Sequence, residues 1–151
     1  MAAKSTAFET DLLKLILNNV ALANIGDAGG LQPSVGAGSL YIGLCTADPG
    51  VGGDQTTNEI SYTGYSRVAV ARDGTQWTVA AGSATNNNTI LFGTMTAGAG
   101  GTVTYFSVGT DSGGVGHLLY RGTITSPVAG LAVTAGIAPE FVASSMTITE
   151  S

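Results

Sequence analysis

Residues 110–114 combine side-chain types that serve nucleophilic catalysis. They read Thr-Asp-Ser-Gly-Gly, and the only histidine of the chain, His117, follows shortly after. In serine hydrolases a histidine takes the proton of the serine hydroxyl, and backbone amides stabilise the oxyanion. Here His117 comes only five residues after Ser112, and a threonine stands where that motif has a glycine. The residues therefore indicate a β-hairpin tip, in which Asp111 and Ser112 bond to the local backbone.

A metal site would have few ligands to draw on. Zinc prefers three or four Cys, His or carboxylate ligands, whereas the chain has one cysteine, Cys45, and one histidine. Asp48, Asp54 and Glu59 lie close enough in the sequence to gather around calcium, but their spacing departs from that of an EF-hand loop. A G-x-x-x-x-G-K-[ST] phosphate-binding loop is missing from the sequence. We expect neither a metal nor a cofactor.

Carbohydrate chemistry is a further possibility to weigh. A glycosidase needs two carboxylates facing each other across a cleft, and a sugar-binding module needs exposed aromatic rings. The aromatic residues are Tyr41, Tyr62, Tyr65, Trp77, Tyr105, Phe106 and Tyr120 among others. In a β-protein such residues more often fill a core or an interface. We expect a protein that is not an enzyme, with a carbohydrate-binding adhesin module as one alternative.

The elements that position these residues begin with one helix, expected at about residues 6–24. Its apolar stripe consists of Phe8, Leu12, Leu13, Ile16 and Val20. Thr6 and Glu9 have the spacing of a capping box, and Gly26 is a stop signal. Two interpretations stay open: the stripe packs on the sheet of its own chain, or it docks on a neighbouring subunit.

Short β-rich segments separated by Gly, Asn and Pro follow the helix. They cover residues 39–45, 65–71, 76–80, 89–92, 103–108, 118–124, 131–134 and 146–149. Many short strands after a single helix favour a mainly β fold, an antiparallel β-sandwich of the jelly-roll type. At 151 residues the chain suits a single domain, residues 1–151.

Composition points to a surface that other proteins cover. Charged residues make up 10% of the chain and hydrophobic residues 44%, against about 25% charged residues in an average soluble domain. The net charge is -5, and the five basic residues lie apart: Lys4, Lys14, Arg67, Arg72 and Arg121. Nucleic-acid binding, which needs clustered Lys and Arg, is disfavoured.

Targeting signals are not evident in the sequence. Charged and amide residues interrupt the apolar stretch near the N-terminus, so it lacks the continuous core of a signal peptide. None of its apolar runs approaches the roughly 20 residues of a membrane span. We expect a protein made in the cytoplasm, with no membrane partner.

Several motifs together are similar to a known family. Residues 40–50 read Leu-Tyr-Ile-Gly-Leu-Cys-Thr-Ala-Asp-Pro-Gly, and Asn-Glu-Ile at 58–60 and Gly-Tyr-Ser-Arg at 64–67 follow. With residues 103–108, 113–114 and 118–120, this pattern resembles a family of small virion proteins of tailed bacteriophages. The similarity covers about residues 8–149 and implies a structural part of the virion without catalytic residues.

The Thr-Ala-Asp-Pro-Gly turn has a physical interpretation. Asp48 accepts hydrogen bonds from backbone amides, while Pro49 and Gly50 reverse the chain. Arg67 is expected to pair across the turn with Asp48 or with Glu59. These five residues are the structural site that the sequence predicts.

Sparse charge and short strands then suggest a role in assembly. The first hypothesis is a capsid decoration or cement protein, a homotrimer on the capsid exterior that binds the major capsid protein and stabilises the shell by repeated contacts. The alternative is a minor tail, baseplate or fibre-attachment protein that binds tail proteins.

Overall fold

The computed structural model describes residues 2–150, and the chain forms two compact units. Unit 1 comprises Met1–Ser39, Ala71–Thr89 and Val142–Ser151, and unit 2 comprises Leu40–Val70 and Ile90–Phe141. The chain passes between the two units four times, so neither unit is one continuous segment. The single domain expected from chain length stays a prediction.

The helix α1 spans Thr6–Asn18 and lies in unit 1. It starts one residue earlier than predicted, since the predicted capping box has Thr6 as the residue before the helix. Ser5 is the N-cap: its hydroxyl accepts a hydrogen bond from the Phe8 amide at 3.3 Å. The capping box predicted between Thr6 and Glu9 is therefore wrong, because Thr6 is already helical. The helix is too short to cross a membrane, and the described residues hold no other helix that could.

The helix ends at Asn18 instead of near residue 24. Asn19 takes a left-handed conformation with φ 54°, and the Val20 amide donates to the Lys14 carbonyl at 3.1 Å, which closes the last turn. Asparagine tolerates this conformation better than most residues. Gly26 therefore plays no part in stopping the helix, and Val20, a member of the predicted stripe, lies outside the helix.

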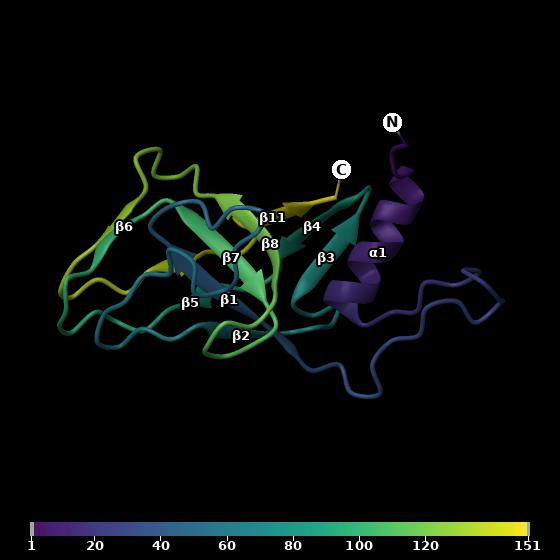
Figure 1. Ribbon diagram of the computed structural model, residues 1–151, viewed down its shortest axis with the longest axis horizontal. Helices are drawn as coiled ribbons and strands as arrows, with labels where there is room; N and C mark the ends of the chain where they lie inside the picture. The colour runs from purple at the N-terminus through teal and green to yellow at the C-terminus, as the bar shows by residue number, and fades with distance from the viewer. Residues whose placement is uncertain (1, 151) are drawn as a thin grey trace. The chain divides into compact units, whose positions relative to one another are not determined.

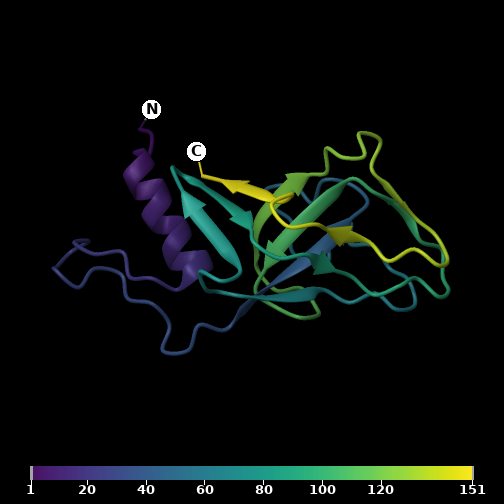
Figure 2. The same cartoon turned by 180° about the vertical axis from the view of Figure 1, so that it is seen from behind.

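A three-stranded antiparallel sheet accompanies α1 in unit 1, in the order β11-β4-β3. The strands are β3 (Trp77–Ala80), β4 (Ser83–Asn86) and β11 (Thr147–Thr149). Figure 1 shows α1 beside the β3–β4 hairpin, and Figure 2 shows β11 beside β4. Leu13 and Leu17 are the buried residues of the helix. The Thr10 hydroxyl also accepts a hydrogen bond from the Gly82 amide in the hairpin turn, at 2.8 Å.

Strand β4 was not expected from the sequence. Its residues, Ser-Ala-Thr-Asn, have weak strand preference apart from the threonine. The turn before it has positive φ at both positions, Ala81 and Gly82, as a two-residue hairpin turn of type I′ requires, but alanine there gives no turn signal. The Asn86 amide is fully buried and satisfied: it donates to the carbonyls of Asn88 and Val142 at 2.9 Å each.

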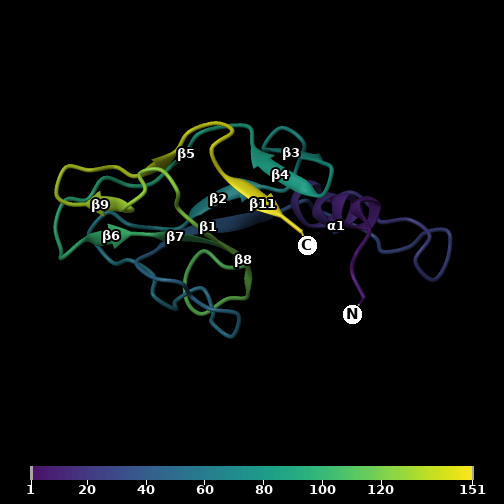
Figure 3. The ribbon, with the colours of Figure 1, turned by 90° about the horizontal axis from the view of Figure 1, so that it is seen from above.

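Unit 2 holds the main sheet, in the order β2-β1-β7-β8. Its strands are β1 (Ser39–Cys45), β2 (Val68–Ala71), β7 (Tyr105–Gly109) and β8 (Leu118–Thr123), of which the first residue of β1 and the last of β2 belong to unit 1. Two small antiparallel pairs complete it: β5 (Ile90–Leu91) with β10 (Glu140–Phe141), and β6 (Gly101–Val103) with β9 (Leu131–Val133). Figure 3 shows β6 and β9 side by side.

Aromatic rings form a chain of contacts through unit 2. Tyr62, Tyr65, Phe92, Phe141 and Phe106 follow one another with ring centroids 5.3 to 6.2 Å apart. Phe106 lies directly opposite Gly122 in the β7–β8 pair. A Cβ on that glycine would lie 2.4 Å from the ring, so the aromatic side chain occupies space that only glycine leaves open.

The mainly β fold with antiparallel sheets and one N-terminal helix is confirmed in residues 2–150. The predicted strand at 103–108 is instead two strands, β6 and β7, which are separated at Thr104. Strand β10 was not predicted, because two residues give no periodic pattern. The jelly-roll arrangement of strands stays a prediction.

Candidate functional site

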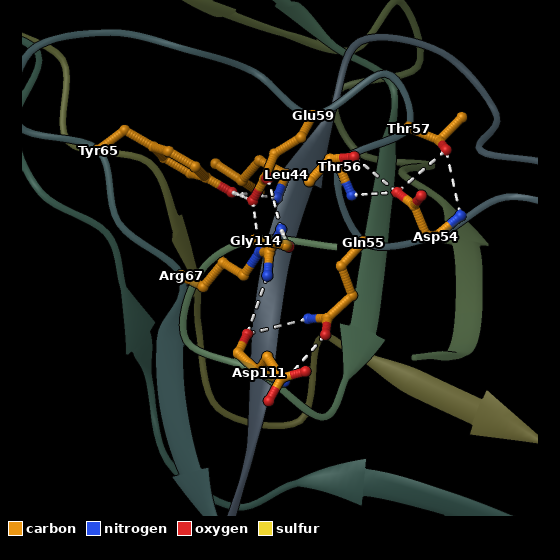
Figure 4. Close-up of polar contacts among 10 residues, drawn as sticks. All are labelled: Leu44, Asp54, Gln55, Thr56, Thr57, Glu59, Tyr65, Arg67, Asp111 and Gly114. Atoms are coloured by element: carbon orange, nitrogen blue, oxygen red, sulfur yellow. Dashed lines mark hydrogen bonds and ion pairs between the residues drawn. The ribbon is translucent and has the colours of Figure 1, made fainter. Parts of the chain in front are cut away.

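Arg67 and Glu59 form a buried ion pair in unit 2 (Figure 4). The Arg67 Nε and Nη2 atoms donate to the two carboxylate oxygens of Glu59 at 2.7 Å each. The side chains are 2% and 15% exposed. Two parallel bonds from a planar guanidinium fix both distance and orientation. Of the two partners expected for Arg67, Asp48 and Glu59, the structure shows Glu59.

The remaining donors of Arg67 hold a loop in place. Residues 110–117 connect β7 to β8 and are called here the 110–117 loop. Nη1 donates to the Asp111 carbonyl and Nη2 to the Gly114 carbonyl, both at 2.9 Å. One buried side chain therefore joins the 59–67 segment to a loop more than 40 residues away in the sequence (Figure 4).

Gln55 fastens the same loop from a second point. Its side chain is fully buried, and its Oε1 atom accepts from the Asp111 amide at 2.9 Å while Nε2 donates to the Asp111 carbonyl at 3.3 Å. The Gln55 backbone amide also donates to the Val115 carbonyl at 2.9 Å. We call Gln55, Glu59 and Arg67 the anchor cluster.

Two glycines make room for the anchor cluster. A Cβ on Gly109 would lie 2.1 Å from the Gln55 side chain, and one on Gly116 would lie 2.0 Å from it. Gly116 also has φ +47°, a conformation that favours glycine. The Gln55 side chain occupies the space that a Cβ at either glycine would fill. The loop and the buried side chain therefore depend on each other.

Tyr65 ties the ion pair to strand β1. Its hydroxyl donates to Glu59 Oε1 at 2.8 Å and accepts from the Leu44 amide at 3.1 Å. Burial raises the pKa of Tyr65 far above its usual range, and burial likewise raises the pKa of the neighbouring Cys45 thiol to about 11. Both groups are thus neutral at physiological pH, and a neutral thiol is a weak nucleophile.

The Asp48–Pro49–Gly50 turn lies in the same unit but has another partner. Asp48 Oδ1 accepts from the Gly50 amide at 2.8 Å, and Gly50 has φ +75°. The carboxylate forms an ion pair with Arg121 of β8 instead of Arg67. The hydrogen bond from the Gly50 amide lowers the pKa of Asp48 most, and Arg121 lowers it further. The turn is thereby fixed to the edge of the main sheet.

The three acidic residues considered for calcium have separate partners. Asp48 binds Arg121 and Glu59 binds Arg67. Asp54 Oδ1 accepts from the Thr56 hydroxyl at 2.6 Å and the Thr56 amide at 2.8 Å, and these bonds lower the pKa of Asp54. Within residues 2–150, the structure brings together no group of three ligands that would hold a metal.

The 110–117 loop differs in detail from the predicted hairpin tip. The Thr110 amide donates to the His117 carbonyl at 3.1 Å, and the His117 amide donates to the Thr110 hydroxyl at 2.9 Å. These bonds close the loop at its base. Asp111 is held through its backbone by distant side chains, instead of bonding the local backbone with its own carboxylate. The prediction of a locally bonded Asp111 was wrong for that reason.

Sequence reasoning found part of this arrangement. Glu59, Arg67 and the Asp48 turn were identified from the motifs, but Gln55 and Arg121 were not. Gln55 stands in a turn-rich segment, and its partners are backbone atoms 56 residues away, for which a single sequence carries no signal. Arg121 belongs to a predicted strand, so its pairing with the turn required knowledge of strand order.

Nearly the whole chain matches one known protein family. A family model described as podophage GP4 fiber I protein gp80 matches residues 3–149. A search of the curated proteins finds no match. The matched range includes α1, every strand and the whole anchor cluster. The chain therefore belongs to this family of phage virion structural proteins, whose model is described as podophage GP4 fiber I protein gp80.

Proposed function

We propose that this protein is a non-enzymatic structural component of the tail fibre of a podophage virion. The observation that carries the proposal is the match of the fibre-protein family to residues 3–149. The anchor cluster supports it, because Arg67 pairs with Glu59, and Arg67 and Gln55 both bind the backbone of a loop. Such groups act by holding shape, which is the chief requirement on a part of a mechanical assembly.

The 110–117 loop is the contact surface that we propose for a neighbouring virion protein. Residues 111–115 are exposed, and the Val115 side chain is 66% exposed although its carbonyl is bound by Gln55. A loop whose backbone is already ordered loses little conformational entropy on binding. The anchor cluster would thus improve affinity by fixing the loop before the partner arrives.

Copy number in purified particles tests the fibre assignment. Quantitative mass spectrometry would compare peptides of this chain with those of the major capsid protein. A fibre component is expected at few copies and in the tail fraction after particles are disrupted. Hundreds of copies that remain with the shell would support the capsid decoration role instead and would overturn the fibre proposal.

A matched pair of variants tests the loop surface. Val115→Glu places a charge on the exposed loop, and Val128→Glu places the same charge at an exposed position elsewhere in unit 2; Val128 is 94% exposed. We expect Val115→Glu to reduce incorporation into particles and Val128→Glu to have little effect. Equal incorporation of both variants at wild-type level would remove the loop from the proposed contact surface.

A further inference from the structure

Strand β8 forms one edge of the main sheet in unit 2, beside β7 (Figure 1). It ends the order β2-β1-β7-β8, and no other strand in the part of the chain that the structure describes pairs with it. Its six residues make it longer than the four-residue strand β2 at the opposite edge. An unpaired edge presents a row of backbone N–H and C=O groups, which is a template for a further extended strand.

The pairing of β8 with β7 determines which backbone groups lie on the free edge. The Ile124 amide donates to the Thr104 carbonyl at 2.8 Å, and the register stays regular through Thr123, Gly122 and Arg121. In an antiparallel pair, hydrogen-bonded and non-bonded positions alternate. Gly122 therefore bonds to β7, whereas the N–H and C=O groups of Arg121 and Thr123 point away from it.

A β-bulge lies at the start of β8. The register with β7 shifts between Val108 and Gly109, which leaves Leu119 without a partner in β7. A bulge interrupts regular pairing and redirects side chains, and Leu119 is 40% exposed. The regular edge that a further strand can use is therefore residues 120–123.

The features that usually protect an edge strand are few along β8. Natural proteins place Lys, Pro or other charged residues there, and residues 118–123 read Leu-Leu-Tyr-Arg-Gly-Thr. The one charged side chain, that of Arg121, is bound to the Asp48 carboxylate. Its charge is therefore compensated within the chain and does not repel an approaching strand.

An open groove lies between the Asp48–Pro49–Gly50 turn and β8. Gly50, Val51 and residues 118–121 line it. Val51 is 96% exposed and Leu119 is 40% exposed, so two of the lining side chains are apolar and open to solvent. When a strand is added to a sheet, main-chain hydrogen bonds give affinity and pockets for alternate side chains give specificity. The groove suits an apolar side chain of an added strand.

We propose that β8 binds an extended segment of a neighbouring virion protein, which adds a strand to the main sheet. The backbone groups of Arg121 and Thr123 bond to that segment, and one of its apolar side chains enters the groove beside Val51 and Leu119. The 110–117 loop leads directly into β8, so the same partner covers both surfaces. The inference rests on the proposed function and deepens it, because it gives the form of the partner that the loop contacts.

Amide hydrogen exchange in the free chain and in assembled particles tests the added strand. Fragmentation by electron transfer resolves single residues. We expect the Arg121 and Thr123 amides to exchange at least about tenfold more slowly in particles, because the partner then binds them. The Gly122 amide, which already bonds to β7, is the control in the same strand and should change little. Unchanged exchange of Arg121 and Thr123 in particles would overturn the proposal.

Proline substitution tests the backbone contact independently. Thr123→Pro removes an outward N–H at a position where an edge strand tolerates proline. The control is Val128→Pro, at the second position of a turn that the Gly130 amide closes on the Pro127 carbonyl at 2.9 Å, where proline is favoured. We expect Thr123→Pro to enter particles at roughly a tenth of the level of Val128→Pro. Equal levels of the two variants, both folded by circular dichroism, would contradict strand addition.

Photo-cross-linking in particles identifies what covers β8. Benzoylphenylalanine in place of Leu119 lies at the groove, and the same replacement of Val128, which is 94% exposed, is the control. We expect mass spectrometry to find adducts from position 119 with one segment of another virion protein, and none with that segment from position 128. Adducts only with a second copy of this chain, or the same adducts from both positions, would overturn the proposal.

The outcome is separable from that of the fibre proposal. Copy number and the tail fraction test the fibre role without reference to β8. Few copies in the tail fraction, with unchanged exchange of Arg121 and Thr123, would contradict the added strand alone. Hundreds of copies in the shell, with slowed exchange of the same amides, would overturn the fibre role and support the strand contact.

Discussion

Arg67→Ala removes the side chain on which the candidate site depends. Arg67 makes four hydrogen bonds, two to Glu59 and two to carbonyls of the 110–117 loop. The substitution leaves the Glu59 carboxylate, only 15% exposed, without its cation, although Tyr65 still donates to it. Breaking a buried ion pair by removing one partner costs about 3 to 5 kcal/mol. We expect a loss of that order in the free energy of unfolding of unit 2.

The assay must follow unit 2 specifically. The only tryptophan, Trp77, lies in unit 1, so its fluorescence reports the other unit. Hydrogen exchange of residues 105–123 reports β7, the loop and β8 directly. A loss of about 3 kcal/mol corresponds to roughly a hundredfold faster exchange of amides that open with the loop. Urea unfolding followed both by tryptophan fluorescence and by circular dichroism would also show whether the two units unfold together.

An exposed ion pair of the same chain is the matched control. Arg121 and Asp48 are 31% and 40% exposed, and solvent screens such surface pairs, so they contribute little to stability. Arg121→Ala should therefore destabilise the protein much less than Arg67→Ala. Equal effects of the two substitutions, or unchanged exchange of the loop in Arg67→Ala, would refute the role assigned to the anchor cluster.

Further predictions concern the loop, the turn and the buried thiol. Gly116→Ala should destabilise the fold by about 1 to 3 kcal/mol or more, because the added Cβ meets the Gln55 side chain; Gly113→Ala, with open space around it, should stay within about 0.5 kcal/mol in the same urea titration. The folded-state pKa of Asp48 is lowered from 3.8, so its stabilising effect is present above that pH and is lost as the pH falls below it. The urea midpoints of wild type and Asp48→Asn should converge in acid, and a constant difference would contradict this. Cys45 should react with a thiol reagent near pH 8 only on unfolding, because burial raises its pKa to about 11; rapid labelling of the native chain would show that the thiol is accessible.

The sequence predicted the elements that rest on local patterns. Alternating and β-branched segments identified most strands, and the Thr-Ala-Asp-Pro-Gly motif identified a turn whose Asp48 caps the Gly50 amide. The end of the helix was missed, because Val20 continues the apolar stripe towards the stop signal at Gly26, whereas the left-handed Asn19 already ends the helix. Strand β4 was missed because its polar residues are satisfied by tertiary contacts.

The site was predictable only where its members lie close in the sequence. Glu59 and Arg67 are eight residues apart, and the sequence named Glu59 as one of two expected partners of Arg67, with Asp48 as the other. The contacts of Gln55 with Asp111 and of Asp48 with Arg121 span 56 and 73 residues. Their partners depend on how β7 and β8 are ordered in the sheet, which propensity and periodicity leave open.

The measurement that tests the central claim most directly is the location of this chain on intact particles. Electron microscopy of particles labelled with a gold-conjugated antibody against the purified protein would locate it. The account predicts label at the tail fibres, at a few positions per particle. Label spread over the whole shell, or particles that carry no label while containing their other tail proteins, would contradict it.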